Sequence, residues 1–318
     1  MSELSATELD CLIIGGGPAG LTAGIYLARF HRRCLIIDAG ASRASYIPTS
    51  HNYPGFPPGI SGPDLLSRLR TQALEYGACI EPGKVESLER CDSGFVATLR
   101  GRSYRARSVI VATGIKDRLP EMSDMDKAIH CGAVRLCAIC DGYEVNGDDV
   151  AVYGEAENAI NHAVFLRTFT DRVTVIVHGD REACDEALRK AAEYDIKLIA
   201  DKVRDIRLTD DQRIEVSTVR GDGHAFDIVY PNLGSTCRAA LIQSLGAEVD
   251  SDGALLVDGH QHTSIEGIYA VGDVVAGLKQ ISVAIGQAAQ AATAVHNRLE
   301  NNPWRRRDEQ SEQGRPAG

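Results

Sequence analysis

The chain has 318 residues, 44% of them hydrophobic, and a formal net charge of −10. This length favours two domains over one, and the acidic balance disfavours a nucleic acid or an anionic membrane as the main partner. No apolar run reaches the roughly 20 residues of a membrane span, and the start MSELSATELD lacks the pattern of a signal peptide. We therefore expect a cytoplasmic protein that acts on small molecules or on other proteins.

The first predicted elements are a short apolar strand over residues 11–14 and an apolar helix that begins near Pro18. The turn between them carries a G-x-G-x-x-G pattern formed by Gly15, Gly17 and Gly20. A second apolar strand ends at Asp38, 23 positions after Gly15. In such a βαβ unit the glycines let the backbone approach a pyrophosphate, and the helix N-terminus favours the anion. The pattern predicts a dinucleotide site in which Asp38 accepts a hydrogen bond from an adenosine ribose hydroxyl.

Two similar patterns follow along the chain. A strand over residues 150–153, a helix through residue 168 and a strand over residues 173–177 predict a second nucleotide-type unit. A strand ending at residue 271 is followed by Gly272, Asp273 and an Ala-rich helix to about residue 299. The alternating segments GFVATLR and RIEVSTVR predict accessory antiparallel strands. The Gly- and Pro-rich residues 50–64 predict a loop over a site or a plain surface connection.

The nine cysteines separate into one close pair and seven scattered residues. The scattered ones fit a reducing compartment and are Cys11, Cys34, Cys79, Cys91, Cys131, Cys184 and Cys237. The pair, Cys137 and Cys140, has three interpretations: half of a zinc site, two packed thiols or a redox-active disulfide. Zinc needs four ligands, and the only other nearby donors are His130 and Cys131. Two thiols at positions i and i+3 at the start of a helical turn can close a short disulfide ring.

Five segments occur in the order typical of low-molecular-weight thioredoxin reductases: IIGGGPAGLTAGIYLAR, HNYPGFP, VIVATG, CAICDG and GIYAVGD. The sequence resembles that family from about residue 9 to residue 299. The resemblance implies an α/β fold of two Rossmann-like three-layer nucleotide-binding domains, the second inserted into the first, and a homodimer. A discontinuous FAD-binding domain would comprise residues 1–119 and 243–300. Residues 120–242 would form the NAD(P)H-type domain that carries the redox CxxC, and residues 301–318 a flexible tail.

By this resemblance the first dinucleotide is FAD. Asp273 would bond the ribityl chain, Asn52 would lie near the isoalloxazine ring, and residues 279–281 would bring the N-terminus of the last helix to that ring. A positive helix end there would stabilise an anionic reduced flavin. The implied FAD-binding residues are Gly15, Gly17, Pro18, Ala19, Gly20, Asp38, Asn52, Ala112, Thr113, Gly114, Gly272, Asp273, Lys279, Gln280 and Ile281.

The resemblance also implies roles for the cysteine pair, and we therefore favour the redox disulfide. Cys140 would be the thiol closest to the flavin, and Cys137 would attack an external disulfide. Asp141 would protonate a departing thiolate, although a residue before glycine can also be a plain turn residue. We expect no metal, and we leave His130 out of the site because such a histidine is more often a satisfied polar residue.

The second unit departs from the family where NADPH should bind. Its fingerprint reads Gly154-Glu-Ala156-Glu-Asn-Ala159, so a methyl group replaces the middle glycine and two glutamates crowd a phosphate-binding helix end. The family carries His-Arg-Arg after the following strand, whereas this chain has His178-Gly-Asp180-Arg181. Losing an arginine and gaining an aspartate disfavours a 2′-phosphate. An acidic residue could suit NADH, but the alanine and the glutamates also stand against it.

The sequence therefore predicts an FAD-dependent thiol-disulfide oxidoreductase that acts on a thioredoxin-like protein or a small dithiol or disulfide, with NADPH a doubtful donor. Ferredoxin is a possible donor if a basic patch such as Arg102, Arg105 and Arg107, or residues 305–307, docks it. Alternatives are a dithiol oxidase running in reverse with oxygen as acceptor, an ordinary NADPH-dependent thioredoxin reductase, and a non-catalytic redox-sensing flavoprotein. Trp304 would cover the flavin or serve as a tail or dimer contact.

Overall fold

A computed structural model of the protein describes residues 8–179 and 183–299. The described chain forms two compact units. Unit 1 contains residues 8–45, 63–115 and 237–299, and unit 2 contains residues 46–62, 116–179 and 183–236. Residues 46–62, which the sequence analysis assigned to the first domain, cluster with unit 2. Asp180, Arg181, Trp304 and residues 301–318 lie outside the described part of the chain.

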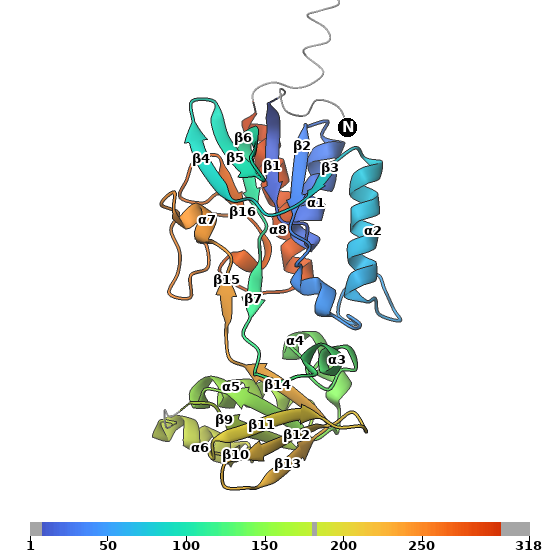
Figure 1. Ribbon diagram of the computed structural model, residues 1–318, viewed down its shortest axis with the longest axis vertical. Coiled ribbons are helices and arrows are strands. Elements are labelled where there is room, and N and C mark those ends of the chain that lie inside the picture. The colour runs from blue at the N-terminus through green and yellow to red at the C-terminus, as the bar shows by residue number, and fades with distance from the viewer. Residues whose placement is uncertain (1–7, 180–182, 300–318) are drawn as a thin grey trace, which may run out of the picture. The chain divides into compact units, whose positions relative to one another are not determined.

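Unit 1 is built on a seven-stranded sheet with the path β3-β2-β1-β6-β5-β4, and β16 also pairs with β6 (Figure 1). The strands are β1 (Leu9–Ile14), β2 (Cys34–Asp38), β3 (Cys79–Pro82), β4 (Ser87–Cys91), β5 (Gly94–Leu99), β6 (Arg102–Val111) and β16 (Ile268–Ala270). The strands β3, β2, β1, β6 and β16 are parallel, so their carboxyl ends meet at one edge. The first half of β6 pairs with β5 in the antiparallel sense.

The two faces of this sheet are covered differently. The helices of unit 1 are η1 (Arg43–Tyr46), α2 (Gly62–Glu75), α7 (Ala240–Gln243), η3 (Gly272–Val274), α1 (Pro18–Arg29) and α8 (Ile281–Arg298). On one face α1 and α8 pack closely, because α8 buries small residues such as Ala288, Ala291 and Ala292 against the β1 side of the core. The core on the other face contains side chains from the strands themselves, β4 and β5 included, together with residues around α7. Unit 1 is thus a layered α/β structure.

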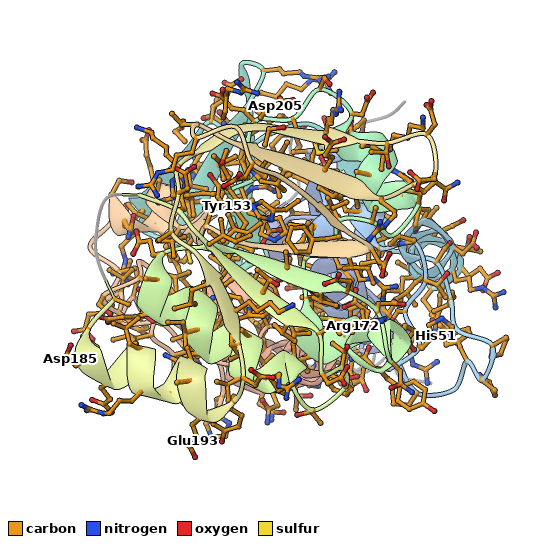
Figure 2. The ribbon with its side chains drawn as sticks, turned by 90° about the horizontal axis from the view of Figure 1, so that it is seen from below. His51, Tyr153, Arg172, Asp185, Glu193 and Asp205 are labelled. Atoms are coloured by element: carbon orange, nitrogen blue, oxygen red, sulfur yellow. A yellow bond between two sulfur atoms is a disulfide. The ribbon has the colours of Figure 1, made fainter. Side chains whose placement is uncertain are left out.

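Unit 2 has three layers around a parallel sheet of order β10-β9-β8-β14. Its elements are α3 (Met125–His130), α4 (Ala138–Asp141), η2 (Tyr143–Val145), β8 (Val150–Gly154), α5 (Ala156–Leu166), β9 (Val173–Val177), α6 (Asp185–Glu193), β10 (Lys197–Ile199), β11 (Val203–Leu208), β12 (Ile214–Thr218), β13 (Gly223–Phe226) and β14 (Ile228–Asn232). The helices α5 and α6 cover one face, and the antiparallel sheet β11-β12-β13 covers the other. In Figure 2 the labelled Asp185 and Glu193 mark the two ends of α6.

Two strands carry the chain into and out of the inserted segment. They are β7 (Ile115–Asp117) and β15 (Ser235–Cys237), and they pair with each other in a two-stranded sheet. Backbone hydrogen bonds flank the pair: Arg118 N donates to Gly234 O at 2.9 Å and Arg238 N donates to Gly114 O at 3.0 Å. The inserted segment therefore begins and ends at neighbouring positions.

The structure confirms the predicted α/β architecture, including both βαβ units and the accessory strands β5 and β12. Some predicted ends are wrong by a few residues. The helix predicted to residue 168 ends at Leu166, where the N–H of Phe169 bonds the Leu166 carbonyl three residues back in a tight turn. The strand predicted to residue 271 ends at Ala270, and the loop predicted to residue 64 ends where α2 begins at Gly62. No helix in the described residues is long and apolar enough to cross a membrane.

Candidate active site

The glycine turn between β1 and α1 is shaped by backbone contacts at two of its three fingerprint positions. Gly15 has φ +117°, and a Cβ there would lie 2.2 Å from Ala112 O. A Cβ on Gly20 would lie 1.9 Å from Gly15 O. Gly17 differs, because the nearest atom its Cβ would meet is Ser42 Oγ at 3.2 Å. The protein's own atoms therefore require glycine at position 17 less strictly than at positions 15 and 20. This fits a glycine whose role is to let the protein backbone approach a bound ligand closely.

Asp38 ends β2 directly beside this turn. Its Oδ1 accepts a hydrogen bond from Gly40 N at 2.9 Å, and its Oδ2 pairs with Arg70 Nη2. A Cβ on Gly16 would meet Asp38 Cγ at 2.2 Å, so glycine at position 16 allows the carboxylate to lie against the turn. Each carboxylate oxygen can accept a second hydrogen bond, so Asp38 still fits the predicted contact with a ribose hydroxyl.

The remaining predicted cofactor residues of unit 1 gather at the same edge of the sheet. Ala112 and Thr113 follow β6 and contact Gly15, and Gly114 turns the chain with φ +66°. A Cβ on Gly272 would lie 3.1 Å from Ala19 Cβ and 3.7 Å from Ala284 Cβ, so the first turns of α1 and α8 meet at this glycine. The structure thus brings the first turn of α1, the end of β6, and η3 together.

Asp273 and the start of α8 complete this edge. Arg43 Nη1 lies 3.7 Å from Asp273 Oδ2, an ion pair that sequence reasoning missed. Gln280 occupies the N-cap position of α8, and Lys279 lies close enough to Cys237 to lower the pKa of its thiol, which burial raises more strongly. The first turn of α1 contains no acidic residue. Two helix N-termini, a glycine cradle and a carboxylate at the end of β2 fit a dinucleotide such as FAD.

The equivalent turn in unit 2 is built differently. Helix α5 has Glu155 as its N-cap and Glu157 in its first turn, so two carboxylates lie where a phosphate would need positive charge. Ala156 is buried, and a Cβ on Gly154 would lie 2.3 Å from Asn232 O. The ring of His178, which follows β9, is held by Tyr153, whose hydroxyl lies 2.7 Å from His178 Nδ1. The start of α5 is therefore a much poorer anion-binding site than the start of α1.

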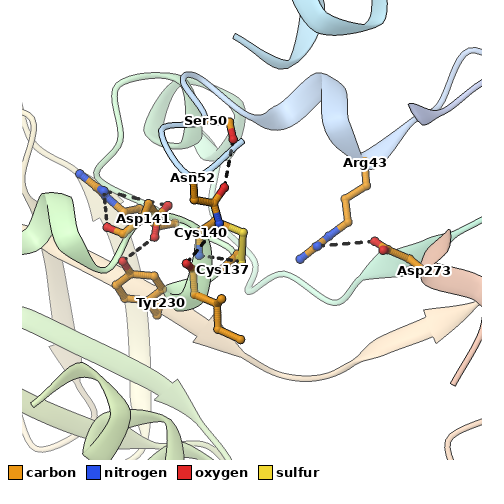
Figure 3. Close-up of a disulfide and its surroundings, with 10 residues drawn as sticks. Arg43, Ser50, Asn52, Cys137, Cys140, Asp141, Tyr230 and Asp273 are labelled. Carbon is orange, nitrogen blue, oxygen red and sulfur yellow. Dashed lines mark hydrogen bonds and ion pairs between the residues drawn. A yellow bond between two sulfur atoms is a disulfide. The ribbon is translucent and has the colours of Figure 1, made fainter. Parts of the chain in front are cut away.

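The sulfur atoms of Cys137 and Cys140 are joined in a disulfide, with the two Cα atoms 5.3 Å apart (Figure 3). Cys137 caps the short helix α4, and Cys140 N donates to Cys137 Sγ at 3.2 Å. Ile139 lies in α4 between the two cysteines and is 52% exposed. The described residues contain no group of three or more histidine, cysteine, aspartate or glutamate side chains able to hold a metal ion.

Asp141 lies in a mostly buried polar environment next to the disulfide. Tyr230 Oη, from β14, donates to Asp141 Oδ1 at 2.7 Å, and Arg135 Nη1 lies 4.0 Å from Asp141 Oδ2 (Figure 3). Burial raises the pKa of Asp141 to about 6, although the Tyr230 hydroxyl and the Arg135 charge act to lower it. Glu144 raises it further. A carboxyl group with this pKa is protonated often enough near neutral pH to act as an acid.

Asn52 belongs to a different unit from the other predicted cofactor residues, which are in unit 1. It lies in unit 2, where its Nδ2 donates to the carbonyl of Ile139 at 3.4 Å and its Oδ1 accepts from Ser50 Oγ at 3.2 Å (Figure 3). His130, which the sequence analysis left out of the site, has its Nδ1 2.6 Å from Asp126 O. Sequence reasoning missed Tyr230, Arg135, Arg70 and Arg43, because nothing in their local patterns signals the distant partners that they contact.

Together these features define a class of protein: a two-unit dinucleotide-binding protein with a disulfide beside a buried acid. Residues 9–288 match the pyridine nucleotide-disulphide oxidoreductase family. The chain is 33% identical over 303 residues to the thioredoxin reductase of Treponema pallidum (strain Nichols), covering 91% of this chain and 96% of that protein. The protein belongs to this family, as a thioredoxin-reductase-like, flavin-dependent disulfide oxidoreductase.

Two solved structures resemble this chain over nearly its whole length. The thioredoxin reductase from Streptococcus pyogenes MGAS5005 has a TM-score of 0.82 and 31% sequence identity, with 91% of this chain and 97% of that chain covered. The structure of HlmI has a TM-score of 0.86 and 28% identity, with 96% and 97% covered. These likenesses confirm the predicted fold class and the family that the five sequence motifs indicated.

The environment of Asp141 makes stability depend on pH. Its folded pKa of about 6 lies above the ordinary 3.8, so the folded state is penalised once the carboxyl ionises, and stability falls as pH rises from about 4 through about 6. We expect Asp141→Asn to remove this penalty and raise the free energy of unfolding by about 2–3 kcal/mol at pH 8.

At pH 5 we expect the gain to shrink to about half of that value. Chemical denaturation of the oxidised proteins at the two pH values measures the difference between variant and wild type, which cancels the contribution of other titrating groups. A gain that stays constant between pH 5 and pH 8, or a loss at pH 8, would show that the carboxyl is not held in this environment.

Proposed function

We propose that the protein is an FAD-dependent thiol-disulfide oxidoreductase that exchanges electron pairs between the Cys137–Cys140 disulfide and an external dithiol or disulfide, without NADPH as its normal donor. The observation that carries this proposal is the disulfide at the start of α4, directly followed by the buried carboxyl group of Asp141. A disulfide that only stabilised the fold would not need an acid with a raised pKa at its side.

The residues proposed to hold FAD are those of the unit 1 edge together with Asn52. Gly15, Gly17 and Gly20 would accommodate the pyrophosphate, Asp38 the ribose, and Asp273 the ribityl chain. When bound, FAD supplies a centre that accepts or donates an electron pair. In this proposal the FAD-binding domain comprises residues 1–119 and 243–300, residues 120–242 form the inserted domain, and the protein is a cytoplasmic homodimer.

The two cysteines have different proposed roles. An external thiolate attacks Cys137 Sγ, the sulfur–sulfur bond breaks, and its electron pair leaves on Cys140 Sγ. Asp141 gives its proton to the departing thiolate, and a second external thiol then displaces Cys137, so that one external disulfide forms. The reverse sequence reduces an external disulfide. The N–H of Cys140, which points at Cys137 Sγ, would stabilise a thiolate on Cys137 in the reduced protein.

The start of α5 and the residues after β9 in unit 2 are poorly suited to bind NADPH. The glutamates at the start of α5 and the buried Ala156 oppose a pyrophosphate, and His178 is already bonded to Tyr153. The residues Asp180 and Arg181, which the sequence analysis also used, lie outside the described part of the chain. Because relatives bear the name thioredoxin reductase, a thioredoxin-like protein is a natural disulfide partner for this chain.

Two routes can replace a nicotinamide donor. In the first, a small dithiol reduces the Cys137–Cys140 disulfide and oxygen is the final acceptor, so the protein acts as a dithiol oxidase. In the second, ferredoxin supplies electrons. The predicted basic patch for ferredoxin is weakened, because Arg102 lies 3.7 Å from Glu81 and Arg107 lies 3.0 Å from Glu8. The dithiol route is therefore the better second candidate.

Anaerobic titration of the purified yellow protein tests these routes. We expect NADPH and NADH, each added in tenfold excess, to bleach the flavin absorbance at least tenfold more slowly than dithiothreitol does. Photoreduced ferredoxin is the third donor to compare. Rapid bleaching by NADPH would identify an ordinary thioredoxin reductase. A spectrum that no dithiol changes would instead favour a non-catalytic redox-sensing flavoprotein.

A further inference from the structure

Tyr230 is a polar residue in an otherwise apolar part of unit 2. It lies in the parallel strand β14, is 0% exposed, and belongs to the core cluster that includes Val152, Ile160 and Leu166. A hydroxyl in such a core is costly unless it makes a hydrogen bond. The bond that the structure gives it runs to Asp141 Oδ1 at 2.7 Å. The strand therefore directs one hydroxyl at the carboxyl group beside the disulfide.

We propose that Tyr230 is a positioning residue for Asp141: its hydroxyl fixes the carboxyl group and sets the pH range in which Asp141 delivers a proton to a departing thiolate. This inference rests on the proposed function, in which Asp141 is the acid of the disulfide reaction. In this role Tyr230 itself transfers no proton.

Groups from several elements face this pair. Arg135, which precedes α4, places Nη1 3.1 Å from the Asp141 carbonyl oxygen and 4.0 Å from its Oδ2. Glu144 in η2 acts on both Asp141 and Tyr230 by its charge. From α5, His162 packs against the Tyr230 ring with centroids 5.6 Å apart, and its Nδ1 accepts from Asn232 Nδ2 at 2.9 Å.

These groups leave Tyr230 as a hydrogen-bond donor across the working pH range. Burial and the nearby Asp141 raise the pKa of Tyr230, so its hydroxyl stays protonated. Burial lowers the pKa of His162 to about 4, so that ring is neutral above pH 5. A hydroxyl that donates to a carboxylate stabilises the ionised form, and therefore Tyr230 holds the pKa of Asp141 below the value that burial alone would give.

The test uses the oxidised, FAD-bound protein and dithiothreitol as the probe. One molecule of dithiothreitol gives two electrons and two protons to the Cys137–Cys140 disulfide and becomes cyclic oxidised dithiothreitol. The initial anaerobic rate of that product is measured between pH 5 and pH 9 and divided by the rate of Asp141→Asn at the same pH. Taking this ratio cancels the pH dependence of the rate that comes from ionisation of dithiothreitol. What remains is the pH dependence that comes from the Asp141 proton.

In the wild type we expect the ratio to fall to one with a midpoint near pH 6, the pKa of Asp141. In Tyr230→Phe, which keeps the ring that fills the core, we expect the midpoint to move up by about one pH unit. Tyr153→Phe is the matched control, because it removes a buried hydroxyl from the same sheet that bonds His178 instead of Asp141. Its midpoint should stay at the wild-type value.

The outcomes separate the two claims. A Tyr230→Phe midpoint that stays at the wild-type value, or an equal loss of rate at every pH, would overturn the positioning role while leaving Asp141 as the acid. An equal shift in Tyr153→Phe would also overturn it, because the effect would then be general to the sheet. A wild-type rate that matches Asp141→Asn at every pH would overturn the role of Asp141 in the proposed function, and the inference with it.

Discussion

Replacing Cys140 with serine is expected to lower the turnover of a dithiol by on the order of a thousand-fold or more, because the electron pair of the broken disulfide then has no second sulfur to occupy. The remaining Cys137 thiol should still react with an external aromatic disulfide, form a stable mixed disulfide and release one thiol. Mass spectrometry of the intact variant measures the adduct, and absorbance measures the released thiol.

Variants of Cys137 and Cys131 test which cysteine meets the external partner. Cys137→Ser should lose turnover to the same extent and also lose rapid adduct formation, because the thiol proposed to meet external partners is gone. Cys131→Ser is the matched control, since Cys131 is an exposed, unpaired cysteine outside the disulfide, and its Sγ lies 3.4 Å from the nearby Ala128 carbonyl oxygen. Near-normal turnover by Cys140→Ser, or a large loss in Cys131→Ser, would refute the proposed redox pair.

The second large effect concerns FAD. Gly17→Ala is expected to weaken FAD binding by roughly 10- to 100-fold, because the methyl group enters the space where the backbone should approach the pyrophosphate. The fold should survive, since the added Cβ would lie 3.2 Å from the small hydroxyl of Ser42 and the backbone at position 17 has φ −78°. Fluorescence of free flavin after dilution measures the dissociation constant.

Gly259→Ala provides the matched control in the same unit. No atom beyond the two neighbouring residues of the chain lies within 4 Å of the Cβ it would add, so the variant should keep wild-type flavin content. Gly15→Ala is unsuitable for this purpose, because its φ of +117° and the 2.2 Å approach to Ala112 O would disturb the turn itself. A Gly17→Ala protein that binds FAD as tightly as wild type would show that the cofactor does not lie against this turn.

Local sequence patterns predicted much of the fold. The apolar strands on either side of the glycine turn identified β1 and β2, because a buried parallel strand needs a short run of apolar residues. The same reasoning found β8, α5 and β9, and the two alternating segments that became β5 and β12. The cysteine pair could be singled out because its two members are close in sequence and begin a helical turn.

Contacts between distant residues could not be predicted in this way. Asp141 and Tyr230 are separated by 89 positions, and Tyr230 sits in an apolar run that indicates a core strand, so nothing local marks its hydroxyl as a partner. Arg70 is a half-buried residue of α2, 32 positions from Asp38. The assignment of residues 46–62 to unit 2 likewise depends on three-dimensional contacts, such as the hydrogen bond from Asn52 to the Ile139 carbonyl.

The paired strands β7 and β15 bear on how such proteins diversify. Because Lys116–Thr236 starts and finishes on adjacent, hydrogen-bonded strands, the ends that flank it in unit 1 are already neighbours. Closing a loop between neighbouring ends costs free energy that grows only slowly with loop length. An insertion at this point can therefore vary in length and sequence without disturbing the strand order of the host sheet.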